Sequence, residues 1–376
     1  MASLETGSRS STESFTSSDT DGADSAKTSA KTGAKTGASV LAVVPTVGAS
    51  PVLENCLRAL KEQRLSSGRL IIALVDQGPK PVELPSGLVD LPLRPERNLG
   101  FTGGTNLGIA AARSRWVATV NDDFVADDGW LLRLQEALEA QPKAAAAQGI
   151  NRSAQQPQLL DGVGLGFNRW LQAVQLGHGE PVLHARSADM HNDDGGGNGE
   201  SSPPREVFGV SATAALYRRS ALEEVALEEI ALGGGASATK QIFDEALGSY
   251  YEDADLALRL RGAGWLSLWV PAAGGAHQGA LSTTSHPPRR LRWLYRNRLL
   301  VVARLLGRAL PAALPTLATR DGLDLTRALI AGRWRDAGAM LQGWGAALKA
   351  LPRYAHRRRA AIPRSDLRHT HHPPWT

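Results

Sequence analysis

The residues best suited to chemistry in this sequence lie in acidic and glycine-rich stretches that are far apart along the chain. The first stretch is VNDDF, in which Asn121, Asp122 and Asp123 follow an apolar run. Adjacent carboxylates repel each other unless a cation or water neutralises them, and Mg²⁺ or Mn²⁺ prefers such oxygen ligands. The stretch therefore predicts a divalent metal site that would offset charge on a departing diphosphate. The alternative is that an aspartate simply caps the helix that follows.

The second acidic stretch, YYEDADLALRLRGAGW, places Glu252, Asp253 and Asp255 at the start of a predicted helix that ends at Gly262 or Gly264. Acids are favourable at a helix N-terminus because that end carries partial positive charge, and this alone would explain Asp255. Asp253 is a candidate general base, because a carboxylate that faces a pocket can accept a proton from an attacking hydroxyl.

His277, in GGAHQGALS, is a candidate metal ligand through a neutral ring nitrogen. The alternative for a lone histidine is a structural role, which is the commoner one.

The third stretch, NLGFTGGTNLGI, holds four glycines and two asparagines at 98–109. Its spacing does not match the G-x-G-x-x-G dinucleotide fingerprint, and no Gly-Lys-Ser/Thr follows as in a P-loop. We expect a loop whose backbone can approach a ligand closely and which opens a helix at 107–115. The N-terminus of that helix would favour a phosphate or a sugar. A tight structural turn is the alternative.

The elements that must position these residues alternate between strands and helices. Short apolar runs at 39–45, 70–78 and 116–123 are typical of buried parallel strands, and helical patterns follow the first run at 51–64 and precede the third at 107–115. This alternation predicts an α/β sheet with right-handed crossovers. Since ligands gather beyond the carboxyl ends of such strands, the polar stretches should share one edge of the sheet.

The chain divides into three predicted parts. Residues 1–38 are rich in Ser, Thr, Ala, Gly and Lys and indicate a disordered tail. Residues 39–285 form the α/β domain, in which 189–204 has the composition of a mobile insertion. Residues 286–376 form a basic helical extension whose pattern is interrupted by Pro311 and Pro315.

Charge is distributed unevenly over the 376 residues, whose formal net charge is +5. Residues 286–376 contain 18 Arg and Lys against four Asp. Such a basic segment suits anionic lipid, polyphosphate or nucleic acid, and the plain alternative is a solvated surface. No nucleic-acid-binding motif accompanies it, so we expect no nucleic-acid partner.

Cys56 is the only cysteine, which excludes an intrachain disulfide and a cysteine-based metal site and fits a reducing cytoplasm. We expect no signal peptide, because the N-terminus lacks an apolar segment. We also expect no transmembrane helix, because two arginines and two prolines break the best candidate, which begins at Leu299.

Taken in order, these stretches resemble the family 2 inverting glycosyltransferases with a GT-A fold, and in particular the bacterial rhamnosyltransferase and galactofuranosyltransferase branch. The resemblance covers about residues 39–304. The matching stretches are VLAVVPT, VDQG, NLGFTGGTNLGI, VNDDF, FGVSATAALYRRSAL, YYEDADLALRLRGAGW, AHQGALS and YRNRLL. The resemblance implies a Rossmann-like mixed, mostly parallel sheet flanked by helices.

The resemblance also implies a reaction. It would be the metal-dependent, inverting transfer of a rhamnose- or galactofuranose-like sugar from a dTDP- or UDP-linked donor. The acceptor would be a hydroxyl of a cell-envelope glycan or of a lipid-linked molecule. We expect a cytoplasmic protein that is peripheral on the inner face of the plasma membrane, bound to anionic lipid through its basic C-terminal helices.

Roles carry over from the resemblance residue by residue. Asp123 and His277 would bind Mg²⁺ or Mn²⁺, Asp253 would be the general base, and Glu252 would hold it or contact the acceptor. Arg296 and Arg298 would meet the diphosphate or the membrane. The nucleotide-sugar would contact a larger set: Thr46 and Asp76 at the base and ribose, then Asn98, Gly100, Phe101, Gly103, Gly104, Asn106, Asn121 and Asp122.

Two departures from the family pattern leave a rival function open. Asn121 stands where a D-x-D motif would have its first acid, and PTVGA follows the first strand where many relatives have an aromatic residue. The rival is a non-catalytic module that binds a nucleotide-sugar or a glycan without turning it over.

Overall fold

The computed structural model describes residues 38–48, 51–187, 203–228, 240–279 and 287–355. Three predicted features lie wholly or mainly outside these ranges: the tail at 1–38, the insertion at 189–204 and the end of the C-terminal extension. In the described part of the chain, the residues from β1 onward form one compact unit.

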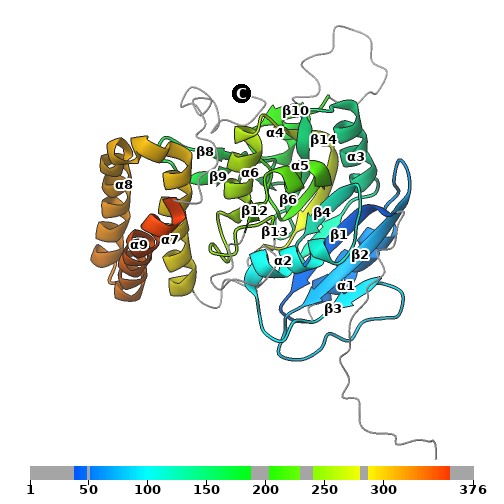
Figure 1. Cartoon of the computed structure of the whole chain (residues 1–376), viewed down its shortest axis with the longest axis horizontal. Helices are drawn as coiled ribbons and strands as arrows, with labels where there is room; N and C mark the ends of the chain where they lie inside the picture. Colours follow the sequence, from blue (N-terminus) through cyan, green and yellow to red (C-terminus); the bar gives the residue numbers. More distant parts are fainter. Residues whose placement is uncertain (1–37, 49–50, 188–202, 229–239, 280–286, 356–376) are drawn as a thin grey trace, which may run out of the picture. The chain divides into compact units, whose positions relative to one another are not determined.

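The main sheet is mixed, and its strand order is β10-β14-β6-β11-β4-β1-β2-β3 (Figure 1). Along this order β14, β6, β4, β1, β2 and β3 run in one direction, and only β10 and β11 run against it. The predicted fold class, a mixed and mostly parallel sheet flanked by helices, is confirmed. The strands on this path are β1 (Ala38–Thr46), β2 (Arg69–Asp76), β3 (Leu91–Leu93), β4 (Trp116–Val120), β6 (Ala144–Ser153), β10 (Arg205–Val207), β11 (Ala214–Arg218) and β14 (Leu266–His277).

Shorter strands extend the sheet or pair beside it. β5 (Phe124–Ala126) pairs with β14, and β7 (Leu160–Gly162) pairs with β6. Two small hairpins are made by β8 (Leu165–Phe167) with β9 (Ala173–Gln175) and by β12 (Leu227–Glu228) with β13 (Lys240–Gln241).

The central strands are buried on both faces, which explains their continuous apolar runs. In β1, Leu41 and Val43 pack into one core cluster while Val40, Ala42 and Val44 pack into another on the opposite face. Apolar residues of α2 (Gly100–Ala110), α5 (Arg219–Glu224) and α6 (Glu252–Gly262) belong to the first cluster. Those of α1 (Pro51–Lys61) and α3 (Trp130–Ala140) belong to the second. Cys56 is fully buried there, as a helix-face core residue should be.

The C-terminal helices share a third core with the sheet domain. They are α7 (Pro287–Leu306), α8 (Leu310–Ile330) and α9 (Trp334–Ala355), and a 3-10 turn at Gly307–Ala309 separates the first two. The buried residues of α7 at 299–306 pack with Ala254 and Leu258 of α6. The expected break at Pro311 is present, because this residue occupies the start of α8. The expected break at Pro315 is wrong, because α8 continues through it. Pro315 costs the helix one backbone hydrogen bond, and the burial of Ala313 and Leu317 on either side of it favours the helix in spite of this loss.

By length and composition alone, one helical stretch among the described residues, Pro288–Ile330, could cross a membrane. More than half of its most apolar window, 56%, is buried inside the protein. This is weak ground for a membrane span.

The predicted helix at 107–115 is wrong in its bounds, and so is the loop before it. The structure has helix α2 at Gly100–Ala110, so the glycine stretch is itself helical. Four glycines lower intrinsic helix propensity, but tertiary contacts outweigh this. Gly108 packs closely on both β1 and β2, because a Cβ there would lie 2.3 Å from Cγ1 of Val43 and 3.2 Å from Cγ2 of Val75.

Candidate active site

Acidic side chains gather where β1 and β4 end. The Thr46 hydroxyl, at the last residue of β1, donates a hydrogen bond of 2.6 Å to the Asp122 carboxylate just beyond β4. Burial raises the pKa of Asp122 to about 6; the Thr46 hydrogen bond opposes this rise, and the Asp123 charge adds to it. The two strand ends meet because β1 and β4 are parallel neighbours, with Val43 paired to Thr119.

His277 joins this group from the end of β14. Its Nε2 lies 3.1 Å from Asp123 Oδ1 and its Nδ1 lies 2.9 Å from Asp161 Oδ2. The backbone holds the same arrangement, because His277 pairs with Phe124 and the Gln278 N–H donates to the Asp123 carbonyl at 3.0 Å. Burial by itself lowers the pKa of His277, but the two nearby carboxylates, Asp123 and Asp161, outweigh it and raise the pKa to about 9.

The residues present fit a divalent cation that shares its ligands with a substrate. Asp123 is buried, and among the described residues its Oδ1 has no hydrogen bond of good geometry, although His277 Nε2 lies 3.1 Å from it. An orphaned carboxylate oxygen beside an imidazole nitrogen is a donor set that Mn²⁺ or Mg²⁺ accepts. Among the described residues, no group of three or more His, Cys, Asp or Glu side chains is arranged to hold a metal alone. The phosphate oxygens of a substrate would therefore have to complete the coordination.

Glu252 and Asp253 form the first turn of α6, as predicted. Burial raises the pKa of Asp253, and hydrogen bonds from the backbone N–H groups of Ala254 and Ala212 oppose the rise. Burial, reinforced by the Asp253 charge, also raises the pKa of Glu252 well above its ordinary value. Both residues retain partial exposure, although Oε2 of Glu252 is itself buried and has no hydrogen-bond partner in the part of the chain that the structure describes.

A short hydrogen-bonded segment connects Asp253 with the VNDDF stretch. The Ser211 hydroxyl lies 3.4 Å from Asp253 Oδ2 and 3.1 Å from the Thr213 hydroxyl. The Thr213 carbonyl in turn accepts from the Asn121 N–H at 2.7 Å. The structure thus brings the Asp123–His277 pair and Asp253 to the same edge of the sheet, although they are distant in sequence.

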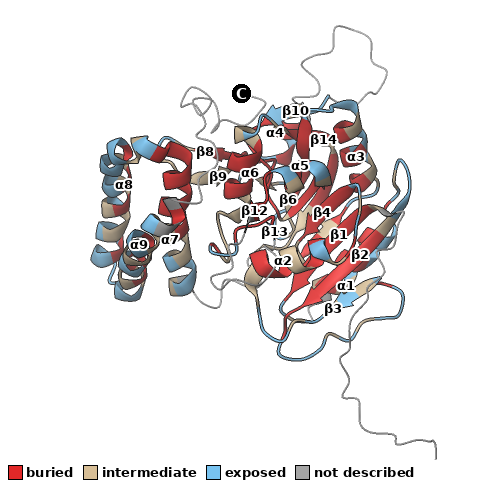
Figure 2. Ribbon diagram, in the orientation of Figure 1, coloured by how far each residue is buried: buried red, intermediate tan, exposed pale blue. Residues whose placement is uncertain are grey.

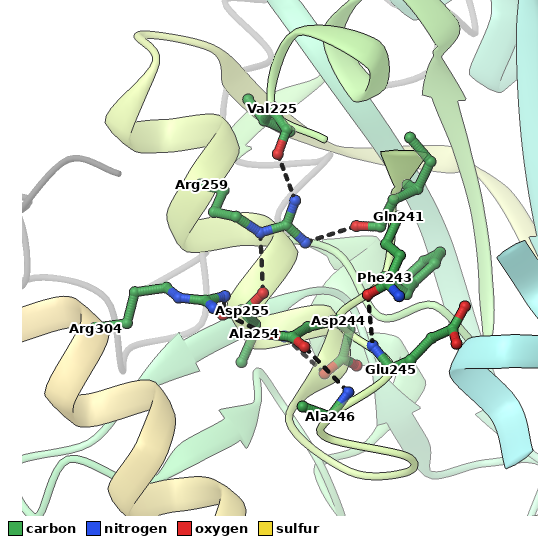
Figure 3. Close-up of polar contacts among 12 residues, drawn as sticks. Val225, Gln241, Phe243, Asp244, Glu245, Ala246, Ala254, Asp255, Arg259 and Arg304 are labelled. Atoms are coloured by element: carbon green, nitrogen blue, oxygen red, sulfur yellow. Dashed lines mark hydrogen bonds and ion pairs between the residues drawn. The ribbon is translucent and has the colours of Figure 1, made fainter. Parts of the chain in front are cut away.

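Buried ion pairs hold α6 in place just after Asp253. Figure 3 shows Arg259 donating to Asp255, one turn earlier on α6, and Arg304 of α7 reaching both Asp255 and Asp244. The Arg259 guanidinium also donates to the carbonyls of Val225 and Ile242. The expected helix-dipole role of Asp255 is therefore joined by a larger one, because this carboxylate is fully buried between two arginines.

The glycines of α2 make room for protein contacts. A Cβ at Gly104 would lie 2.6 Å from Nε2 of Gln77, and one at Gly103 would lie 2.7 Å from Cβ of Leu99. Gln77 accepts from the Leu99 N–H and donates to the Gly100 carbonyl, which ties the helix start to the end of β2. Gly100 has a φ of +73°, a left-handed conformation that favours glycine.

The remaining predicted residues of this stretch also have protein partners. The Asn98 carboxamide oxygen accepts from the Gly100 N–H at 2.8 Å. The Asn106 side chain donates to the Phe243 carbonyl and accepts from the Phe243 N–H, at 2.8 and 2.9 Å. Phe101 stacks edge-on against Phe243, with ring centroids 6.0 Å apart. The stretch thus positions the 243–248 segment that leads into α6.

A pocket of about 630 Å³ opens beside the N-terminus of α2. It lies next to Asp76, whose carboxylate accepts from the Gly78 and Val82 N–H groups and pairs with Arg94. Its walls come from the segments after β2 and β3: Gln77, Gly78, Pro79, Arg94, Pro95, Glu96, Arg97 and Asn98. Asn98 therefore lines this pocket and Asp76 lies beside it, and both are residues that the resemblance assigns to the nucleotide-sugar.

Arg298 does not face a ligand or a membrane. It is 4% exposed, and its guanidinium pairs with Asp321 of α8 at 2.7 Å. Arg296 donates to the neighbouring Asn297 side chain at 2.7 Å. The predicted contact of Arg298 with the diphosphate or the membrane is wrong, because α7 buries this side chain against α8.

Sequence reasoning missed Asp161, Ser211 and Gln77. Asp161 lies in QLLDGVG, a segment that reads as a loop, and nothing near it in the sequence indicates that its carboxylate orients His277. Ser211 lies within the matching stretch FGVSATAAL, which was the only available signal. Gln77 follows Asp76 directly, where the family often has Asn.

Comparison with known proteins agrees with the fold. Residues 41–226 match the description "Glycosyl transferase family 2". Over 87 residues, 23% of this chain, the sequence is 40% identical to an N-acetylglucosaminyl-diphospho-decaprenol L-rhamnosyltransferase of Mycobacterium tuberculosis. The matched segment spans about a quarter, 24%, of that relative's length.

Solved structures are similar at low identity. A structure of GalNAc-T7 with UDP, GalNAc and Mn²⁺ aligns with 72% of this chain and 51% of its own, at 11% identity and a TM-score of 0.47. A mannosyltransferase from Pyrobaculum calidifontis, solved with GDP-Man and Mn²⁺, aligns with 85% of both chains at 17% identity and a TM-score of 0.41.

The family match runs from within β1 to just past α5 and includes the acids after β4, while α6 and His277 lie beyond it. The sheet order, the strand-end acids and this match converge on one assignment. The chain belongs to glycosyl transferase family 2 and is a glycosyltransferase with a GT-A fold.

Proposed function

We propose that this glycosyltransferase moves a rhamnose- or galactofuranose-like sugar from a dTDP- or UDP-linked donor, with inversion at the anomeric carbon. The acceptor is a hydroxyl of a cell-envelope glycan or of a lipid-linked molecule. The matched segment of the rhamnosyltransferase supports this choice, because that protein is named for a diphospho-decaprenol acceptor. A lipid-linked acceptor puts the enzyme at the inner face of the plasma membrane.

The observation that carries the proposal is the grouping of Asp123, His277 and Asp253 at one edge of the sheet. Asp123 and His277 would hold Mg²⁺ or Mn²⁺ together with the donor diphosphate, and Asp161 would orient the imidazole through Nδ1. When bound, the cation supplies neutralising charge for the leaving diphosphate.

Asp253 accepts the proton of the acceptor hydroxyl as this attacks the anomeric carbon, which contributes about 10²–10⁴-fold in rate. Its raised pKa suits this role, because a base works best when its pKa lies closer to the working pH. Glu252, whose Oε2 lacks a hydrogen-bond partner among the described residues, holds Asp253 in place or contacts the acceptor.

The test uses the purified full chain with a panel of dTDP- and UDP-sugars, a soluble acceptor analogue and Mn²⁺. We expect metal-dependent nucleotide release, an inverted product by NMR, and loss of both on adding EDTA. Asp253→Asn should abolish transfer while donor binding by calorimetry remains, and Asp128→Asn, at an exposed aspartate, is the matched control. Donor binding without turnover in the wild-type protein would identify a binding module instead.

A further inference from the structure

Helix α9 carries a stripe of exposed apolar side chains along its outer side. Trp334, Leu341 and Leu348 are 69%, 58% and 55% exposed, and each follows the last by seven residues. This spacing returns to nearly the same side of a helix every two turns, so the stripe runs about 21 Å. Ile330, 83% exposed, lies at the turn where α8 meets α9. Figure 2 shows exposed residues along both helices.

The opposite side of α9 is firmly packed, so the stripe lies on a fixed surface. Ala337 and Met340 are buried in a cluster with α8 and α7 residues, and Ala347 and Tyr354 belong to the third core. Gly343 lets α9 approach α7 closely, because a Cβ there would lie 2.7 Å from the Arg292 carbonyl oxygen.

The exposed charges of the C-terminal helices that carry the stripe have one sign. Within the described part of 287–352, every exposed charged side chain is basic. The three acids of this segment are not exposed, and each lies in an ion pair with an arginine: Asp321 with Arg298, Asp324 with Arg320, and Asp336 with Arg333. The exposed basic residues are Arg289, Arg290, Arg292, Arg308, Arg327, Arg333, Arg335 and Lys349.

We propose that α9 and the α8–α9 turn lie in the interface of an anionic lipid bilayer, with Trp334, Leu341, Leu348 and Ile330 entering the headgroup region. Apolar side chains flanked by Arg and Lys are the composition of interfacial helices, and tryptophan favours the membrane interface. A second copy of the chain is the less favourable occupant, because it would bring two basic surfaces together. Lipid binding by α9 deepens the proposed function, because it assigns the membrane contact of the enzyme to one helix. It rests on the proposed function only for its biological purpose.

The test is flotation of the full chain with vesicles of phosphatidylcholine alone or with phosphatidylglycerol added, at physiological salt. We expect the wild-type protein to float with the anionic vesicles and to stay behind with the neutral ones. The triple variant Trp334→Ser, Leu341→Ser, Leu348→Ser should lose binding on the order of tenfold or more. Leu183→Ser, at a 70% exposed leucine of α4 (Val182–Ser187), is the matched control and should bind as the wild type does.

Three further results decide the proposal. Replacing Arg333, Arg335 and Lys349 by Gln should weaken binding to anionic vesicles, since each basic residue near an anionic surface contributes separately. Equal flotation of the wild-type protein and the triple variant would overturn the proposal. So would light scattering that shows a wild-type dimer which the triple variant converts to monomer. Turnover with a soluble acceptor, measured in parallel, separates failure of the proposed transfer reaction from failure of membrane binding.

Discussion

Arg304 of α7 offers the sharpest test of how the C-terminal helices belong to the enzyme. Its guanidinium is 2% exposed and lies between Asp244 and Asp255, both of which are fully buried (Figure 3). Arg304→Met keeps the volume and the apolar stem but removes the charge. The two carboxylates would remain in the interior, and Asp255 would keep only Arg259 of its two arginines.

The expected cost follows from this geometry. Removing one partner of a buried ion pair destabilises a protein by about 3–5 kcal/mol, because an uncompensated charge is left behind. That is a large fraction of a typical unfolding free energy of roughly 5–15 kcal/mol. The low exposure of all three side chains leaves little solvent to screen the loss.

Urea unfolding followed by circular dichroism measures this cost. Arg308→Met, at an exposed arginine one turn further on, is the matched control and should stay within about 0.5 kcal/mol of the wild type. Arg304→Lys should recover only part of the lost stability, because a single ammonium group cannot pair with both carboxylates as the planar guanidinium does. A loss below about 1 kcal/mol for Arg304→Met would refute the reasoning and would favour a separable extension at 286–376.

Asp253→Asn should raise the melting temperature by a few degrees at pH 8 while abolishing transfer. Burial raises the pKa of Asp253 in the folded protein, so its ionisation costs the wild-type protein stability as pH rises. The higher melting temperature of the variant should therefore vanish at acid pH, where the wild-type Asp253 is protonated. Wild-type transfer should fall as pH drops through the raised pKa. A gain that persists unchanged at acid pH would contradict this. Asp161→Ala should weaken Mn²⁺ binding about 10–100-fold by calorimetry with donor present, and Asp161→Asn, which keeps an acceptor for His277, should lose less; equal affinities in all three proteins would remove Asp161 from the site. Gly108→Ala should destabilise by about 1–3 kcal/mol in urea, because its Cβ would meet Val43, whereas Gly322→Ala, with open space around it, should be neutral or stabilising. Equal unfolding curves would refute the packing account of the glycine.

Local pattern was sufficient for the strands and for the acids at their ends. The runs that became β1, β2 and β4 are apolar because both faces of the sheet are covered, and this is visible without coordinates. The start of α6 at Glu252 and its end at Gly262 follow from acids in the first turn and glycine after the last. These features depend on neighbours in sequence, so the sequence alone predicts them.

Tertiary contacts decided the rest. The glycine stretch has the composition of a loop, yet it is helical, and it packs so closely on Val43, Val75 and Gln77 that a Cβ at Gly104 or Gly108 would clash with them. Asp161 has no neighbouring signal, since it acquires its role only because β6 pairs with both β7 and β14, which brings its carboxylate within 2.9 Å of His277 Nδ1. Arg298 is basic in a basic segment and is nevertheless buried, because Asp321 of another helix meets it. Local physical preference thus determined which of these segments became strands and helices along the chain. Which side chains meet was decided by long-range packing, which no single stretch of sequence contains.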